Sequence, residues 1–319
     1  MSTSVHSPRP RLSAGRLLYL TVHQPLGWME HSWREGGPLN QWITRRGRLA
    51  MIEAARRLPP LPAAPPDAPE VCFLTGRRFW YQTAFCFWSL CRHSGRSFTP
   101  VFIDDGSFDD ALRAECLRLF PGARIPSRDE INSRMEAALP AARFPALTGQ
   151  RRTYLHLRKI TDAHAGLNGW RLVLDSDMLF FRRPDALLAW CDAPAKPVHM
   201  LDVENAYGYP METLVELAGG PIPTKINVGV CGLHSDAIDW EKLEWCCARL
   251  LARHGTSYYL EQALVALLLA GRETTLLPPS DYRLMPDEKE CRAPQAVLHH
   301  YVAESKRGYF RHAWKILHP

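Results

Sequence analysis

Apolar and polar residues alternate along the chain in two different ways, and the change falls near residue 70. Residues 39–58 carry a helix-like spacing of apolar positions. They lead into LPPLPAAPPDAPE, which holds six prolines between Pro59 and Pro69 and cannot form a helix. We expect this stretch to be a linker, or an extended strap lying over the following domain. Residues 1–15 are polar and rich in proline and arginine, a composition typical of disorder.

From residue 70 onward, short apolar runs alternate with helical patterns. The runs VCFLTG, TPVFIDDG and WRLVLDSD predict buried strands. The spacing of apolar residues predicts helices over 79–93, 109–119 and 152–165. Continuous apolar strands separated by helices predict a mostly parallel sheet that is covered on both faces. Ligands bind such sheets at the carboxyl ends of the strands.

Each predicted strand ends in polar residues that would lie together at one edge of the sheet. The three ends are Thr75, then Asp104 and Asp105, then Asp175 and Asp177. Asp175 and Asp177 are two positions apart, so an extended strand places both carboxylates on the same side. Crowded carboxylates repel each other and need a counter-charge, which Mg²⁺ or Mn²⁺ with substrate phosphate oxygens would supply. The alternative is an ordinary pair of aspartates in a turn.

Composition limits the classes of partner. The chain has 39 basic and 33 acidic residues, a net charge of +6. This excess is modest and forms no dominant run, so we do not expect nucleic acid as a partner. It suits anionic ligands such as nucleotide diphosphates, or an anionic membrane surface. Nine cysteines without a CxxC pair argue against zinc-ribbon and thioredoxin sites. With no long apolar segment and no signal-peptide pattern, we expect a cytoplasmic protein without a transmembrane helix.

The string LVLDSDMLFF resembles the motifs of two enzyme families. One is the hhhhDxD motif of haloacid-dehalogenase-type phosphohydrolases, in which the first aspartate is a nucleophile. Those enzymes usually carry it on the first strand, whereas here two strand–helix units precede it and Met178 and Leu179 follow. The other is the DxD motif of GT-A glycosyltransferases, which holds the metal that bridges a sugar-nucleotide diphosphate.

Further motifs, in the same order along the chain, resemble the retaining family-8 type of glycosyltransferase. That family places a basic residue before the DxD strand to reach the donor, and Arg158 or the adjacent Lys159 stands there. Its Asn-x-Gly element, which contacts the donor sugar, is similar to the stretch that begins at Asn227. Its acidic residue followed by glutamine, beside the anomeric carbon, is similar to Glu261 and Gln262, although the family generally has aspartate at the first position.

The resemblance continues to the end of the chain, where AVLHHYVAESKRGYF predicts a strand ending at His299 and His300. The family has a strand-terminal histidine as third metal ligand and a lysine on the diphosphate, which implies His300 and Lys306. We expect His299 to face the opposite side. The stretch TGRRFWYQTAFCFWSLCRHSG also resembles the opening of bacterial GT-A-like proteins, in which the first strand's end and the helix after it hold the nucleotide base. The candidates for that role are Thr75, Tyr81, Asp104 and Asp105. The aromatic residues of this stretch could equally be core packing.

The resemblance implies a GT-A domain over 70–319, with a Rossmann-like mixed sheet flanked by helices, preceded by an N-terminal extension over 1–69. It implies a metal-dependent hexosyltransferase that transfers a sugar, with retention, from a UDP-sugar or another nucleotide-diphosphate sugar to a hydroxyl of a saccharide or glycolipid. The DxD phosphohydrolase, a nucleotidyltransferase and an inactive sugar-nucleotide-binding module are alternatives. A nucleotidyltransferase would normally have a glycine-rich loop after its first strand, but LTGRRFWYQ has one glycine. A homodimer and a peripheral membrane contact stay open.

Overall fold

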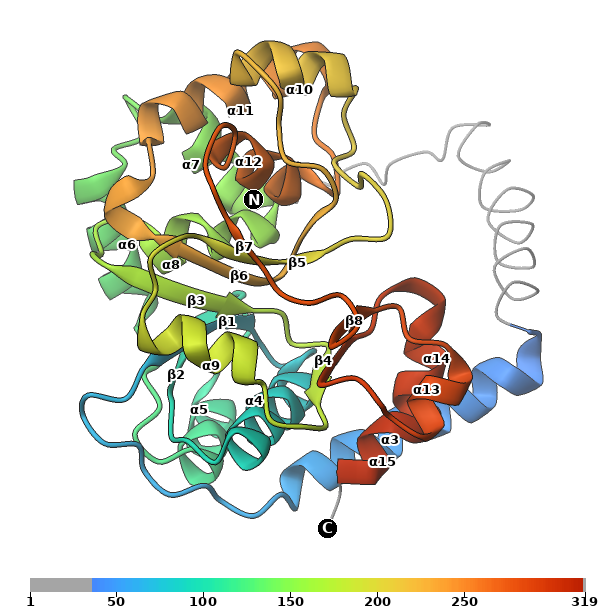
Figure 1. The fold of residues 1–319 in the computed structure, drawn as a ribbon. Coiled ribbons are helices and arrows are strands. Elements are labelled where there is room, and N and C mark those ends of the chain that lie inside the picture. Colours follow the sequence, from blue (N-terminus) through green and yellow to red (C-terminus); the bar gives the residue numbers. More distant parts are fainter. Residues whose placement is uncertain (1–35, 318–319) are drawn as a thin grey trace, which may run out of the picture.

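A mixed six-stranded sheet forms the centre of the molecule in the computed structural model, which describes residues 36–317 (Figure 1). The disorder expected for residues 1–15 lies outside the described residues. The strand order is β2-β1-β3-β6-β5-β7. The strands are β1 (Glu70–Thr75), β2 (Thr99–Asp104), β3 (Trp170–Leu174), β5 (Val198–Leu201), β6 (Ile226–His234) and β7 (Thr275–Leu276).

Only part of this sheet is parallel. Strands β2, β1 and β3 are parallel to one another, and β7 is parallel to β5, whereas β6 runs antiparallel to both β3 and β5. Since β6 is antiparallel to both of its neighbours, β3 and β5 run in the same direction, and five of the six strands share one direction. The expectation of a mostly parallel sheet is therefore confirmed, with β6 as the reversed strand, whose direction the spacing of apolar residues does not identify. The mixed sheet with flanking helices is confirmed.

Successive residues of the central strands enter two separate hydrophobic cores. On β1, Val71 and Phe73 belong to one core, and Cys72 between them belongs to the other. Helices cover both faces (Figure 1), and a strand buried on both faces reads as a continuous apolar run. One core includes α4 (Trp80–Ser94), α5 (Asp110–Leu119) and α9 (Asp185–Asp192). The other includes α6 (Arg128–Ala138), α7 (Pro145–Thr153), α8 (Thr161–His164), α10 (Met211–Ala218), α11 (Trp240–His254) and α12 (Leu260–Leu268).

The helices expected over 79–93 and 109–119 correspond closely to α4 and α5. The single helix expected over 152–165 is wrong. Helix α7 ends at Thr153, Tyr154 is extended, and a 3₁₀ helix, η2 (Leu155–Lys159), precedes α8. The Tyr154 hydroxyl donates to the Tyr258 carbonyl oxygen at 2.6 Å. Tertiary contacts of this kind override a helical pattern.

A second, three-stranded sheet lies beside the first and consists of β4 (Met178–Phe180), β9 (Leu298–His300) and β8 (Tyr282–Leu284), in that order. Strand β9 is antiparallel to β4 and parallel to β8. The run LVLDSDMLFF therefore contains parts of two strands, β3 in the large sheet and β4 in the small one. Its two aspartates lie in the short connection between these strands.

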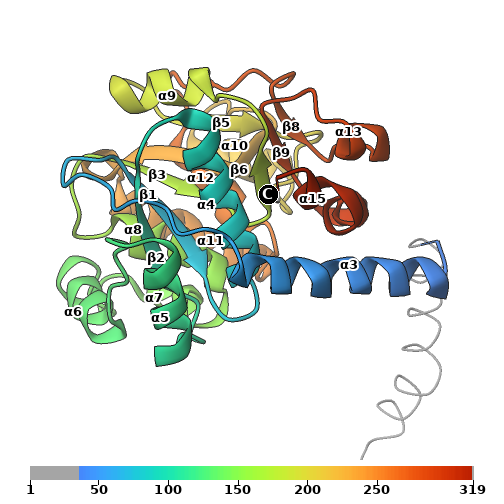
Figure 2. The same ribbon diagram turned by 90° about the horizontal axis from the view of Figure 1, so that it is seen from below.

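The described part of the N-terminal extension packs onto the C-terminal segment. Helix α3 (Pro38–Arg56) lies against η5 (Tyr309–Ala313) and projects past the body of the domain (Figure 2). A Cβ on Gly47 would overlap the Phe310 carbonyl, so glycine permits this close contact. The proline-rich stretch follows as an extended strap, in which Leu61 N–H donates to the Leu119 carbonyl at 2.9 Å. No helix of the described residues is long and apolar enough to cross a membrane.

Strand β9 is held in place by His299, whose side chain points to the side of the strand opposite to that of His300. His299 lies 2.9 Å from Glu290 on one ring nitrogen and 2.9 Å from the Tyr301 hydroxyl on the other. The opposite orientation expected for His299 is confirmed. Glu290, in α13 (Glu288–Arg292), also accepts the backbone N–H groups of Gln295 and Ala296. Burial raises the pKa of Glu290, but these donors outweigh it and lower the pKa to about 2.

Because the pKa of Glu290 is depressed, its ionised form stabilises the fold above its unfolded pKa of 4.5, and this contribution is lost as the pH falls toward 2. We expect Glu290→Gln to lower the free energy of unfolding by about 2–3 kcal/mol at pH 7, and by much less at pH 2.5. Urea unfolding of both proteins at the two pH values measures the difference. An equal difference at both would contradict the role given to the carboxylate.

Candidate functional site

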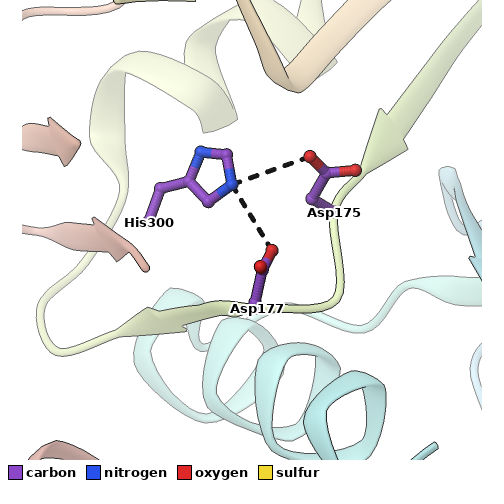
Figure 3. A group of neighbouring side chains, drawn as sticks. All are labelled: Asp175, Asp177 and His300. Carbon is purple, nitrogen blue, oxygen red and sulfur yellow. Dashed lines mark ion pairs between the residues drawn. The ribbon is translucent and has the colours of Figure 1, made fainter. Parts of the chain in front are cut away.

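Two carboxylates and one imidazole converge where the two sheets meet (Figure 3). Asp175 follows β3, Asp177 precedes β4, and His300 ends β9. Nε2 of His300 lies 3.6 Å from Asp175 Oδ2 and 3.4 Å from Asp177 Oδ1. One ligand atom from each residue lies within 4.8 Å of the other two. The structure thus brings together the three side chains that the sequence named as metal ligands.

Strand pairing explains how residues so distant in sequence meet. In the β4–β9 ladder, Met178 stands opposite His300, and the Tyr301 N–H donates to the Asp177 carbonyl at 2.9 Å. The Asp175 N–H donates to the Gly229 carbonyl at 2.8 Å, which extends the β3–β6 ladder by one step. Each aspartate is therefore held by the backbone of a neighbouring strand.

The hydrogen bonds of Asn227 determine which nitrogen of His300 carries a proton. Asn227 Nδ2 donates to Asp202 at 3.1 Å, so its Oδ1 faces His300 Nδ1, also at 3.1 Å. Because an amide oxygen only accepts, Nδ1 must be the donor. In the neutral ring Nε2 then carries a lone pair. This buried atom has no hydrogen-bond partner in the described structure.

A lone pair that faces two carboxylates is unfavourable unless a positive charge lies between them. A proton on Nε2 or a cation would supply that charge. Two carboxylate oxygens and one imidazole nitrogen form a donor set that suits a divalent cation. Asp202 and Asn227 would then be the outer groups that orient the histidine ligand. The residues present therefore fit a divalent metal ion.

Each of the two aspartates pairs one carboxylate oxygen with a lysine, and its other oxygen faces His300. Lys159 Nζ lies 2.6 Å from Asp175 Oδ1, and Lys306 Nζ lies 3.1 Å from Asp177 Oδ2. Lys159 is buried and also contacts Glu261 at 2.9 Å. Lys306 is part-exposed and lies at the start of α14 (Lys306–Gly308). Lys306 can therefore turn toward a ligand, whereas Lys159 is confined between carboxylates.

The charges of these groups are strongly coupled. Burial alone would raise the pKa of Asp177, but His300 and Lys306 outweigh it and hold this pKa well below its usual range. Burial would lower the pKa of Lys159, but Asp175 and Glu261 raise it above its usual value. Burial raises the pKa of Glu261 to about 7, against the opposing effect of Lys159. Glu261 thus ionises near neutral pH, whereas Lys159 stays charged.

Asp202 connects the two amides of the site and was not identified from the sequence. One oxygen, Oδ2, accepts from Asn227 Nδ2 at 3.1 Å and from Gln262 Nε2 at 3.2 Å. Gln262 also donates to the Ala206 carbonyl at 2.8 Å. The available signal was an aspartate directly after the short apolar run of β5, the same pattern that marks Asp175 after β3.

These residues line a cavity of about 430 Å³. Four aromatic residues also line it: Tyr154, His156, Tyr258 and Tyr259. The non-glycine residues with positive φ in the described chain are Lys225, Met285 and Ala303, at 56°, 52° and 46°. Met285 and Ala303 line this cavity, and Lys225 lies two residues before Asn227. Backbone strain of this kind concentrates at functional sites.

The remaining candidates lie outside the lining of this cavity. Arg158 Nη1 donates to the Asp104 carbonyl at 2.8 Å, so the side chain points toward the end of β2, not toward Asp175. Thr75 shares a hydrogen bond of 2.6 Å with Thr83, which in turn contacts Ser176 at 2.7 Å. The ligand roles of Arg158 and Thr75 stay predictions.

The other three candidates for the nucleotide base also make local contacts. The Asp104 carboxylate accepts from Arg128 Nε at 2.8 Å and from the Gly106 N–H at 2.7 Å. Asp105 accepts from Ser107, and the buried Tyr81 hydroxyl lies 3.1 Å from Gln82 Nε2. Their roles in binding a base stay predictions.

Comparisons with known proteins identify the fold. No protein-family model and no curated protein matches the chain. Among solved structures, mouse xyloside xylosyltransferase 1 in its apo form superposes with a TM-score of 0.51 and 11% identity, over 75% of this chain and 98% of that one. The fold is that of the GT-A glycosyltransferases. The apo structure of the bifunctional glycosyltransferase WbbM gives 0.50 and 12%, over 81% of this chain and 52% of WbbM, so the chain spans about half of WbbM.

The close packing of Gly229 under His300 generates a test of the metal site. A Cβ on Gly229 would overlap Cε1 and Nδ1 of the His300 ring, so Gly229→Ala should displace the imidazole. We expect Mn²⁺ binding, measured by calorimetry, to weaken at least about tenfold, since an altered ligand orientation costs on the order of 10–100-fold in affinity. The control is Gly149→Ala in α7, where a Cβ meets nothing within 4 Å. Equal Mn²⁺ affinity in both variants would exclude His300 as a ligand.

The buried Lys159 generates a second test. Lys159→Met leaves Asp175 and Glu261 without their cation and should lower the free energy of unfolding by about 3–5 kcal/mol. Adding Glu261→Gln removes one of the stranded carboxylates, so the double variant should regain a large part of that loss. Denaturant unfolding of the wild type, both single variants and the double variant measures the coupling. Strict additivity of the two changes would contradict a Lys159–Glu261 interaction.

Proposed function

We propose that the protein is a metal-dependent glycosyltransferase that transfers a sugar from a nucleotide-diphosphate sugar to an acceptor hydroxyl. The observation that carries this proposal is the buried Nε2 of His300, which has no hydrogen-bond partner in the described structure and faces the Asp175 and Asp177 carboxylates inside a cavity of a GT-A fold. A metal ion held by these three side chains would keep coordination positions open toward a substrate in the cavity.

Asp175, Asp177 and His300 would hold the ion. Carboxylate oxygens suit Mg²⁺ and Mn²⁺, and the imidazole nitrogen favours Mn²⁺ of the two. When bound, the ion would neutralise the donor diphosphate and the charge that develops on the leaving nucleoside diphosphate. Lys306, which is part-exposed beside Asp177, would leave that carboxylate to bind a diphosphate oxygen.

Asn227, Gln262 and Glu261 would orient the donor sugar. Asn227 and Gln262 share the Asp202 carboxylate, so both amides are fixed before a sugar binds, and fixed groups lose less entropy on binding. With its pKa near 7, Glu261 would exist in both protonation states at neutral pH. Transfer with retention of the anomeric configuration rests on the resemblance to the family-8 type, in which an acidic residue also lies beside the anomeric carbon.

The nucleotide base would lie at the ends of β1 and β2, near Thr75, Tyr81, Asp104 and Asp105, and a UDP-sugar of the hexose type is our first choice of donor. Arg158, which contacts the Asp104 carbonyl, would act at the same end of the site. The aromatic lining of the cavity, with Tyr258 and Tyr259, suits the apolar face of a saccharide or of the sugar of a glycolipid acceptor.

A thermal-shift screen of UDP, GDP, CDP and their sugars, with and without Mn²⁺, tests this function. We expect one nucleotide to raise the melting temperature only with metal, because a ligand that binds the native state stabilises it. Asp177→Asn should abolish this shift and sugar transfer, whereas the matched control Asp185→Asn, at an exposed carboxylate, should leave both unchanged.

Other outcomes separate the alternatives. Metal-dependent nucleotide binding without transfer or sugar-nucleotide hydrolysis would indicate an inactive binding module. Release of phosphate from a phosphomonoester without any nucleotide effect would indicate the phosphohydrolase. Either result would reject the glycosyltransferase proposal.

A further inference from the structure

Helix α3 carries a row of apolar side chains that are largely exposed in the described structure. Leu39 and Trp42 are 69% and 53% exposed, and Ile43 and Leu49 are 39% and 53% exposed. Their spacing of three, four and ten residues from Leu39 places them on one side of the helix. Exposed apolar groups that form a contiguous stripe mark an interaction surface, whereas isolated ones do not.

The opposite face of α3 holds the helix firmly to the domain. Gly47, Met51, Ala54 and Ala55 are buried there, and Gly47 contacts the backbone of Phe310. The helix therefore has two apolar sides: one packs against the domain, and the other is exposed. Figure 2 shows that α3 projects from the body of the domain, in agreement with the exposure of Leu39, Trp42 and Leu49 in the described structure.

The charge of this helix is the second observation. Residues 38–57 contain five arginines, at 45, 46, 48, 56 and 57, and one acidic residue, Glu53, so their net charge is +4, within a net charge of +6 for the whole chain. The Arg46 guanidinium lies 4.7 Å from the centre of the Trp42 ring, so the apolar stripe and the cationic groups are in direct contact. The occupant of this surface must therefore be both apolar and anionic.

We propose that the outer face of α3 binds the surface of a membrane that contains anionic lipids. Trp42, Leu39 and Leu49 would enter the boundary between headgroups and acyl chains, and the exposed Arg45 and Arg46 would pair with lipid phosphates. A second copy of the chain fits less well, because a symmetric dimer would place two +4 helices against each other. This inference is independent of the proposed sugar transfer.

Co-sedimentation of the full chain with phosphatidylcholine vesicles, with and without about 30% phosphatidylglycerol, tests the proposal. The wild type should bind only the anionic vesicles, and added salt should release it. Arg45→Gln with Arg46→Gln should weaken binding at least about tenfold, at roughly fivefold per arginine. Trp42→Ser should weaken binding by a similar factor. Melting temperatures should be unchanged, since these side chains are exposed.

Helix α11 offers a matched control. Its Trp245 is 46% exposed and also lies beside an arginine, Arg249. However, residues 240–254 contain three basic and two acidic residues, a net charge of +1. Trp245→Ser should leave vesicle binding unchanged. Equal vesicle binding by Trp42→Ser and the wild type, or equal binding of the wild type to both kinds of vesicle, would overturn the proposal. A dimer in sedimentation velocity that dissociates in Trp42→Ser would also overturn it.

Discussion

The repulsion between the Asp175 and Asp177 carboxylates is the constraint around which the site is arranged. Each aspartate gives one oxygen to a lysine, Lys159 or Lys306, and turns the other toward His300. With Glu261 ionised, three carboxylates and two ammonium groups leave a charge of −1, and with Glu261 protonated the sum is zero. A divalent cation would make the site positive, which is the charge that a diphosphate requires.

This arrangement depends on the junction of two sheets. Asp175 is positioned by the large sheet through Gly229, and Asp177 by the small sheet through Tyr301. Only residues 175–177 connect β3 to β4, so a displacement of either sheet would separate the two carboxylates. The Glu290–His299 contact fixes β9 from the far side, which keeps the imidazole of His300 in the cavity. Structural and ligand-facing histidines thus alternate on one strand.

The parts of this site that could be predicted from the sequence are those with a local pattern. The buried run before Asp175 marks a strand end, and His300 after a short strand is visible in the same way. Lys159 could not be separated from Arg158, because a helix was expected where a 3₁₀ turn sends the two side chains to different places. Asp202 also follows a short apolar run, but its role arises from two amides contributed by β6 and α12, which that local pattern does not reveal.

The boundary near residue 70, between the N-terminal extension and the domain, is another feature that the sequence pattern predicts only in part. A change in apolar spacing near residue 70 divides the chain in sequence, but α3 contacts the segment that follows Lys306. Arg48 lies over the ring of Tyr81 at 5.8 Å, and that ring lies 6.4 Å from Phe310. The helix therefore supports both α4 and the C-terminal segment that presents Lys306 to the cavity. The contacts of Gly47 and Tyr81 with Phe310 join positions more than 200 residues apart. A pattern of apolar spacing along the chain does not reveal such contacts, through which the extension is coupled to the site.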